Sequence, residues 1–228
     1  MTTDSAAAPV IAIDGPSGSG KGTISALVAE RLGWHLLDSG ALYRIVAAVA
    51  LDRALDLDDG AALAAAARGL RIRFEGGRVL VDGRDRTEDI RTEAVSEGAS
   101  KVAASPAVRE AVLELQRAQR RPPGLVADGR DMGTEVFPDA PLKVFLDASP
   151  EVRAERRYNQ LKNKGLSVSL GALLASIRER DERDRRRAVA PLRPAADALL
   201  IDSTDMSIDT VLARVLEAAA ERGLTPGA

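Results

Sequence analysis

The chain has 228 residues, 45% of them hydrophobic, and is long enough to bury one substantial core. Its formal net charge of −2 gives no global attraction to nucleic acid or to an anionic membrane. It has no cysteine and a single histidine, His35, which excludes disulfides, thiolate metal sites and clusters of histidine ligands. Residues 1–8 are predicted to be a tail without the basic start of a secretory signal. No apolar run approaches the length of a membrane span, so we expect a soluble cytoplasmic protein.

The first predicted strand, residues 10–13, leads through a glycine-rich turn into a helix that starts near Gly20. Glycines allow successive N–H groups to point inward and bind phosphate oxygens, and the positive end of the helix dipole faces the same anion. Lys21 adds a charge for the β- and γ-phosphates, but Gly22 replaces the usual hydroxyl residue, which follows at Thr23. A glycine-rich turn without a ligand is the alternative. The predicted ATP-binding loop is Gly15, Pro16, Ser17, Gly18, Ser19, Gly20, Lys21, Gly22 and Thr23.

The second predicted strand, residues 34–37, leads into a helix whose first turns carry polar side chains. Gly33 ends the helix before this strand, and Asp38 or Ser39 can cap the helix after it. Arg44 lies one turn into that helix, from where it can reach an acceptor phosphate. The alternative for Arg44 is an ion-paired surface arginine.

An antiparallel pattern follows an alanine-rich helix at residues 58–69. Polar and apolar residues alternate at residues 70–74, a turn follows at residues 75–78, and residues 79–81 form a second short strand. Such a β-meander does not fit a β-α-β alternation, so we expect a small antiparallel insert over about residues 70–89.

The rest of the chain alternates between helices and strands. Helices are predicted at about residues 93–103, 106–120, 170–187 and 207–220, and strands at residues 125–127, 142–146 and 198–201. A further helix opens at residues 149–151 and is interrupted by Gly165 near residues 162–166. Five apolar strands separated by helices predict a parallel sheet covered on both faces, with ligands bound at the carboxyl ends of the strands. The polar strand ends are Asp14-Gly15, Asp38-Ser39-Gly40, Asp128 to Asp131, Asp147 and Asp202-Ser203.

Four sequence blocks together are more specific than the phosphate loop alone. They are Asp-Gly-Pro-Ser-Gly-x-Gly-Lys-Gly-Thr (14–23), Leu-Leu-Asp-Ser-Gly-Ala-x-Tyr-Arg (36–44), Ala-Asp-Gly-Arg-Asp-Met-Gly (127–133) and Glu-Arg-Asp-x-Arg-Asp-x-x-Arg (179–187). With these blocks the chain resembles the bacterial cytidylate kinase family over about residues 10–225. The resemblance implies an α/β P-loop NTPase fold of three layers, with a five-stranded parallel sheet, a small antiparallel β insert that binds the nucleoside monophosphate, and a short lid.

The same resemblance implies an ATP-dependent phosphotransferase that phosphorylates CMP or dCMP. It implies Mg²⁺ bound to ATP mostly through water, with Thr23 as the nearest protein candidate. We expect one kinase domain and a monomer. Its parts are a core of residues 9–58, 120–152 and 190–225, an insert of about residues 63–103, and a lid of about residues 156–168 that carries Lys162 and Lys164.

Phosphoryl transfer to a nucleoside monophosphate needs positioning and charge shielding rather than acid–base chemistry, so arginines suit it. By the resemblance the catalytic residues are Lys21, Arg130, Arg180 and Arg187, while Arg156 belongs to the ATP site. The predicted acceptor site is Asp38, Ser39, Tyr43, Arg44, Ser100, Arg109, Asp128, Gly129, Arg130, Asp131, Arg180, Asp184 and Arg187.

The resemblance places Ser100, Arg109 and Asp131 on the cytosine edge. A carboxylate accepts from the exocyclic amine of cytosine and an arginine donates to its N3 and O2, whereas uracil would turn a carbonyl toward Asp131. Without the resemblance, Ser100 and Arg109 are equally well interpreted as residues on helix surfaces.

Several alternatives stay open from the sequence. A UMP/CMP, adenylate or shikimate kinase shares the phosphate loop, but the β insert and residues 128–131 argue against it. A non-catalytic nucleotide-sensing module is a second alternative, against which Lys21 and the arginine set argue. The arginines at residues 178–187 also fit a solvated helix with ion pairs, and Arg156 also fits a basic exposed loop.

Overall fold

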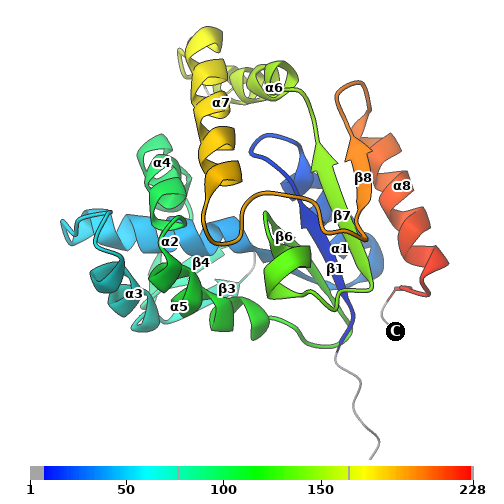
Figure 1. Ribbon diagram of the computed structural model, residues 1–228, viewed down its shortest axis with the longest axis horizontal. Helices are drawn as coiled ribbons and strands as arrows, with labels where there is room; N and C mark the ends of the chain where they lie inside the picture. Colours follow the sequence, from blue (N-terminus) through cyan, green and yellow to red (C-terminus); the bar gives the residue numbers. More distant parts are fainter. Residues whose placement is uncertain (1–7, 76–77, 164, 227–228) are drawn as a thin grey trace, which may run out of the picture. The chain divides into compact units, whose positions relative to one another are not determined.

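The computed structural model describes residues 8–75, 78–163 and 165–226. Most of the predicted tail (residues 1–7), residues 76–77 of the predicted turn, and Lys164 of the predicted lid lie outside these ranges. The chain divides into two compact units. The first joins the residues up to Leu37 with those from Gln119 onward, and the second is Asp38–Ala118 (Figure 1).

A five-stranded sheet of the order β2-β6-β1-β7-β8 forms the centre of the first unit (Figure 1). The strands are β1 (Val10–Asp14), β2 (His35–Asp38), β6 (Leu125–Gly129), β7 (Leu142–Asp147) and β8 (Leu199–Asp202). β1 pairs in parallel with β6 and β7, and β7 pairs in parallel with β8. Every residue of β1 and β6 is buried, so both faces of the sheet are covered. The predicted parallel sheet of the P-loop fold is confirmed.

The strand register brings several polar strand ends to one edge of this sheet. Asp14 at the end of β1 lies opposite Gly129 in β6 and Phe145 in β7. Asp147 of β7 lies opposite Asp202 of β8. Parallel strands end at the same edge, so the loops that follow β1, β6 and β7 start side by side.

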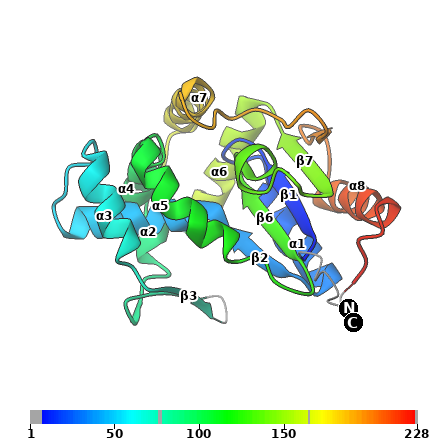
Figure 2. The same ribbon diagram turned by 60° about the horizontal axis from the view of Figure 1, so that its bottom comes forward.

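In the described part of the first unit the α-helices are α1 (Lys21–Leu32), α6 (Pro150–Asn163), α7 (Leu170–Arg186) and α8 (Ile208–Glu221). Val28 of α1 and Val215 of α8 are fully buried in one core with strand residues such as Ile13, which covers one face of the sheet. Figure 2 shows α1 beside β1 and α8 beside β7. Gly33 ends α1 in a left-handed conformation (φ 64°), as expected from the sequence. The π-helical turn η2 (Met132–Val136) was not indicated by the sequence.

The second unit contains the predicted antiparallel insert. β3 (Ile72–Glu75), β4 (Arg78–Val81) and β5 (Arg84–Asp85) form a sheet of the order β3-β4-β5, with antiparallel pairing throughout. The insert is confirmed, and β5 adds a strand that the sequence did not predict. The helical segments of this unit are α2 (Ser39–Asp52), α3 (Gly60–Arg68), η1 (Asp89–Arg91), α4 (Glu93–Val102) and α5 (Pro106–Arg117).

Within this unit α2 packs against α4, and α3 packs against α5. Ala47 and Ala50 of α2 are fully buried, as are Leu63 of α3 and Val112 of α5. Across both units, no helix in the described ranges is both long and apolar enough to cross a bilayer.

Candidate active site

The loop between β1 and α1 has the geometry of a phosphate-binding loop. A Cβ on Gly15 would lie 2.1 Å from the backbone oxygen of Leu146 in β7, so only glycine fits this close approach. Gly18 (φ 80°) and Gly20 (φ 93°) adopt left-handed conformations that glycine favours. Gly20 is the N-cap of α1 and makes no side-chain capping bond, so amides of the first turn are available to an anion.

Lys21 of this loop faces a carboxylate at the end of β6. Its Nζ lies 3.6 Å from Oδ1 of Asp128, and both side chains are largely buried. A Cβ on the neighbouring Gly22 would lie 3.2 Å from Oδ2 of the same carboxylate. The glycine that departs from the common phosphate-loop pattern therefore leaves room for the counter-ion of the lysine.

A second charged cluster joins β6 to α7. Nε of Arg130 donates to Oδ2 of Asp184 at 2.6 Å, and a guanidinium nitrogen of Arg187 lies 3.6 Å from Oδ1. Burial alone would raise the pKa of Asp184, but Arg130, Arg187 and Arg180 outweigh it and hold that pKa below its usual range. Burial would lower the pKa of the Arg130 guanidinium, but Asp184 raises it above its ordinary value. In the sequence, Arg180, Asp184 and Arg187 lie four and three residues apart and so share one helix face, but nothing indicated that Arg130 joins them.

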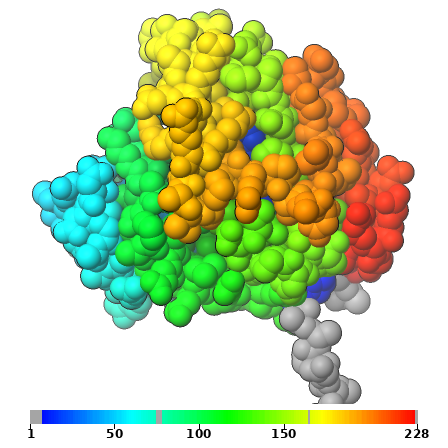
Figure 3. Space-filling view, viewed as in Figure 1, coloured from blue at the N-terminus to red at the C-terminus, as the bar shows by residue number. Residues whose placement is uncertain are grey.

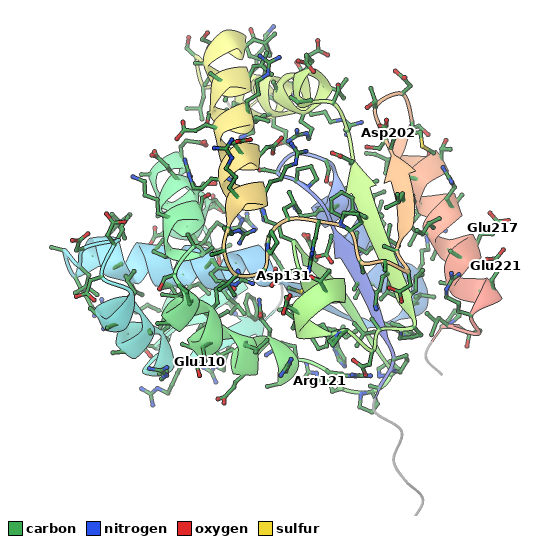
Figure 4. The ribbon with its side chains drawn as sticks, in the orientation of Figure 1. Glu110, Arg121, Asp131, Asp202, Glu217 and Glu221 are labelled. Carbon is green, nitrogen blue, oxygen red and sulfur yellow. The ribbon has the colours of Figure 1, made fainter. Side chains whose placement is uncertain are left out.

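Asp14, the last residue of β1, holds the turn that follows Asp131. Its two carboxylate oxygens accept from the backbone N–H groups of Met132 and Gly133, both at 2.8 Å. Burial raises the pKa of Asp14 to about 7. The two hydrogen bonds lower this pKa, and the nearby charges of Asp131 and Asp128 raise it further. Asp131 is itself 3% exposed and lies just after β6 (Figure 4). The sequence placed Asp14 at a strand end but did not identify this bond pair.

Two arginines of α6 reach the phosphate loop. Arg156, a predicted ATP-site residue, donates to the backbone oxygens of Ser19 at 3.2 Å and Ser203 at 2.7 Å. Arg153, which the sequence analysis did not single out, donates to the backbone oxygen of Ser17 at 3.0 Å and is ion-paired with Asp181. Residues 156–163 of the predicted lid continue α6 as one helix.

The predicted site residues of the second unit form two contacts of their own. Asp38 caps α2 by accepting from the backbone N–H of Ala41, and it also accepts from Arg44 at 2.6 Å. The Arg109 guanidinium lies 5.7 Å from the centre of the Tyr43 ring. The remaining members of this set are Ser39 and Ser100, both buried.

Ser100 on α4 and Arg109 on α5 are 5% and 8% exposed. Neither is therefore a residue on a helix surface, which was the alternative that the sequence left open. A buried arginine needs acceptors, and Arg109 donates to the backbone oxygen of Ala103 at 3.4 Å.

The donor set fits a magnesium ion that arrives with the nucleotide. Within the described residues, no three acidic, histidine or cysteine side chains come together as a metal site. Mg²⁺ commonly keeps several waters and is held through substrate phosphates and few protein oxygens. Thr23 is exposed in the first turn of α1 and offers such an oxygen.

Comparisons with known proteins agree with this geometry. A model of the family described as cytidylate kinase matches residues 11–221. A protein of Pseudomonas paraeruginosa named cytidylate kinase is 58% identical over 224 residues, which cover 96% of this chain and 98% of that protein. A protein of the same name from Aeromonas salmonicida is 58% identical over 219 residues, with 94% and 95% covered.

A solved structure described as a gluconokinase from Sinorhizobium meliloti 1021 is 16% identical, with 94% of this chain and 92% of that chain covered. Its TM-score of 0.47 is too low to carry a conclusion about this chain.

Proposed function

The chain belongs to the cytidylate kinase family, and on this premise we propose that it transfers the γ-phosphoryl group of ATP to CMP or dCMP. The products are ADP and CDP or dCDP. The observation that carries the proposal is the strand register, in which Asp14 lies opposite Gly129. It puts the phosphate loop with Lys21 and the segment with Arg130 at one edge of the sheet.

The donor side of the proposal rests on the phosphate loop. Backbone N–H groups within residues 17–23 bind the phosphates of ATP, and Lys21 exchanges part of its contact with Asp128 for the β- and γ-phosphates. Thr23, together with the phosphates and water, would hold Mg²⁺, and the ion would supply neutralisation of phosphate charge. Arg156 contacts the same loop through the Ser19 oxygen, which supports its assignment to the ATP site.

The acceptor side needs no general base, because the attacking phosphate oxygen of CMP is already an anion near neutral pH. That oxygen forms a bond to the γ-phosphorus while the bond from the γ-phosphorus to the β,γ-bridging oxygen breaks, and ADP leaves with the electron pair. Arg130, Arg180 and Arg187 stabilise the charge that spreads over the transferred group. Arg44 binds the acceptor phosphate, and Asp38 orients Arg44 through their 2.6 Å bond.

The base and sugar of the acceptor are assigned to buried polar groups. Asp131 accepts from the cytosine amine, and Ser100 and Arg109 complete the recognition of its edge. The burial of each of the three side chains supports its assignment to a polar recognition role, because a uracil carbonyl would leave the buried Asp131 carboxylate facing another acceptor. Asp184 and Arg187 bind the ribose, while Ser39, Tyr43, Asp128 and Gly129 line the acceptor site.

We further propose a cytoplasmic monomer that takes ATP and CMP or dCMP as its small-molecule partners. The insert of residues 63–103 and the lid of residues 156–168 are proposed to close on the nucleotides. Closure would exclude water and limit hydrolysis of ATP.

A coupled assay of ADP release tests the proposal, with CMP, dCMP, UMP, AMP, shikimate and no acceptor compared at equal concentration. We expect turnover with CMP and dCMP well above the rate without an acceptor. A preference for UMP, AMP or shikimate would assign the chain to another kinase reaction. ATP binding without any acceptor-dependent turnover would instead indicate a nucleotide sensor.

A further inference from the structure

Arg153 on α6 is a fully buried arginine, with 1% of its surface exposed. Its guanidinium donates to three separate parts of the first unit. Nε donates to the backbone oxygen of Ala148 at 2.9 Å, just after β7. One terminal nitrogen donates to the backbone oxygen of Ser17 at 3.0 Å and to Oδ1 of Asp181 at 3.0 Å, and the other donates to Oδ2 of Asp181.

Stability alone does not account for such a pair. Removing two charges from water is costly, and well-packed apolar residues of similar volume often replace a buried ion pair without loss of stability. The pair instead fixes geometry, because a planar guanidinium that bonds a carboxylate through two nitrogens allows little rotation or sliding.

Arg153 bonds two segments that carry proposed catalytic residues, the phosphate loop and α7. Ser17 lies in the phosphate loop, whose Gly18 packs so closely that a Cβ there would lie 3.2 Å from Cβ of Arg153. Asp181 lies on the buried face of α7 together with Ile177 and Asp184. It therefore lies between Arg180, the preceding residue, and Asp184, which accepts from Arg130.

On the face shown in Figure 3, little of the blue β1–α1 region is visible behind the gold segment that contains α7. Figure 1 shows α6 and α7 side by side, and these two helices are in direct contact. A rotation of α7 against α6 would therefore displace Arg180 and Arg187 together, because both follow the position of this helix.

We propose that Arg153 is a positioning residue for phosphoryl transfer, which sets α7 with Arg180 and Arg187 against the phosphate loop through Asp181. The inference rests on the proposed function. A variant that lacks Arg153 but still folds should therefore carry out phosphoryl transfer more slowly than the wild type. A misplacement of about 1 Å at the reacting groups costs on the order of 100-fold in rate.

The chain supplies a matched control. Arg178 on α7 donates to Glu151 on α6 at 2.7 Å, so it links the same two helices. Both side chains are more than half exposed, and among the described residues their hydrogen bond is to each other rather than to the phosphate loop. Arg178→Ala should leave kcat within about twofold of the wild type. Val215 lies in the core on α8, and Val215→Ala lowers the stability of the protein without changing a residue of the proposed site. This variant shows how much kcat falls when stability alone is reduced.

The test is the double variant Arg153→Met, Asp181→Leu, assayed for melting temperature and for the kinetics of the acceptor that the wild type phosphorylates. We expect melting near that of the wild type, a kcat lower by about 100-fold, and KM values for ATP and acceptor within about threefold. A folded double variant with kcat within threefold of the wild type would overturn the proposal.

If the double variant does not fold, Arg153→Lys decides. A lysine keeps the charge next to Asp181 but cannot also make the bonds to Ser17 and Ala148. We expect the kcat of Arg153→Lys to fall by about tenfold or more. At the same melting temperature, this fall in kcat should be larger than the fall seen in Val215→Ala. A kcat that only follows melting temperature would reject the positioning role. A wild type without acceptor-dependent turnover would reject the proposed function instead.

Discussion

Nε of Arg130, one residue after β6, donates a 2.6 Å hydrogen bond to Oδ2 of Asp184 on α7. The Asp184 side chain is 4% exposed, and Arg187 lies 3.6 Å from its other oxygen. The bond joins two segments that are 54 residues apart, both of which carry proposed catalytic arginines. It therefore links the segments that carry these arginines.

Asp184→Asn should destabilise the protein by roughly 3 kcal/mol at pH 7, because it leaves buried arginine charge without its counter-ion. The pKa of Asp184 is held below its usual value of 3.8, so its stabilising effect is present above that value and is lost as the pH falls through the folded-state pKa. The loss caused by the variant should therefore shrink below about pH 4. Denaturant unfolding of both proteins from pH 3 to pH 8 measures it.

Glu179→Gln is the control on the same helix, since Glu179 pairs with Arg183 at the surface. We expect little change in stability there at any pH. Equal losses of unfolding free energy in Asp184→Asn and Glu179→Gln would contradict a stabilising role of the buried ion pairs around Asp184.

The contribution of the buried Asp14 carboxyl to stability should depend on pH in the opposite direction. Its pKa is raised from 3.8 to about 7, so the stability it contributes is complete below about pH 4 and is lost as the pH rises to about 7. Asp14→Asn stays neutral throughout and resembles the protonated acid. The wild type should lose stability relative to this variant by up to about 1.4 kcal/mol per pH unit between pH 5 and pH 7. A constant difference between the two unfolding curves would show that Asp14 stays ionised.

Gly22→Ala tests why glycine replaces the usual hydroxyl residue in the phosphate loop. The added Cβ would lie 3.2 Å from Oδ2 of Asp128, so the carboxylate must shift by a few tenths of an ångström away from its place beside Lys21. We expect kcat to fall by about tenfold. Gly171→Ala, near the start of α7 where a Cβ meets only Ser169 Oγ at 3.8 Å, should keep full activity. Equal activity of the two variants would mean that Gly22 is not required for the Lys21–Asp128 contact.

Asp131→Ala tests the assignment of the base edge. Loss of the carboxylate removes the acceptor for the cytosine amine, so kcat/KM for CMP should fall by about 100-fold while the Kd for ATP changes by less than about threefold. The advantage of CMP over UMP should narrow in the same variant. Calorimetric titration with ATP and steady-state kinetics with both acceptors measure these effects. Equal losses for ATP and CMP would place Asp131 elsewhere in the mechanism.

The parts of the fold that depend on local pattern were predictable from the sequence. The phosphate loop, the five parallel strands and the antiparallel insert each follow from periodicity and glycine placement within a short window. The π-helical turn at Met132–Val136 was not, because two backbone N–H groups of this segment bond to Asp14, which is remote in sequence.

The candidate site was also predictable from the sequence only in part. Spacing along one helix indicated that Arg180, Asp184 and Arg187 share a face, but it could not show that Arg130 would pair with Asp184. The burial of Ser100 and Arg109 was equally undecided, since helix spacing allowed a surface position. The ion pair of Arg153 with Asp181 joins residues 28 apart, and the one sequence signal for it was an acidic residue on the apolar face of α7, in line with Ile177.

Competition between two acceptors tests the central claim most directly. The purified protein is given ATP and Mg²⁺ with equal concentrations of CMP and UMP, and CDP and UDP are quantified by chromatography at low conversion. The ratio of the two products equals the ratio of the kcat/KM values. We expect CDP to form at least about 100-fold faster than UDP. Equal formation of the two products, or an excess of UDP, would contradict it.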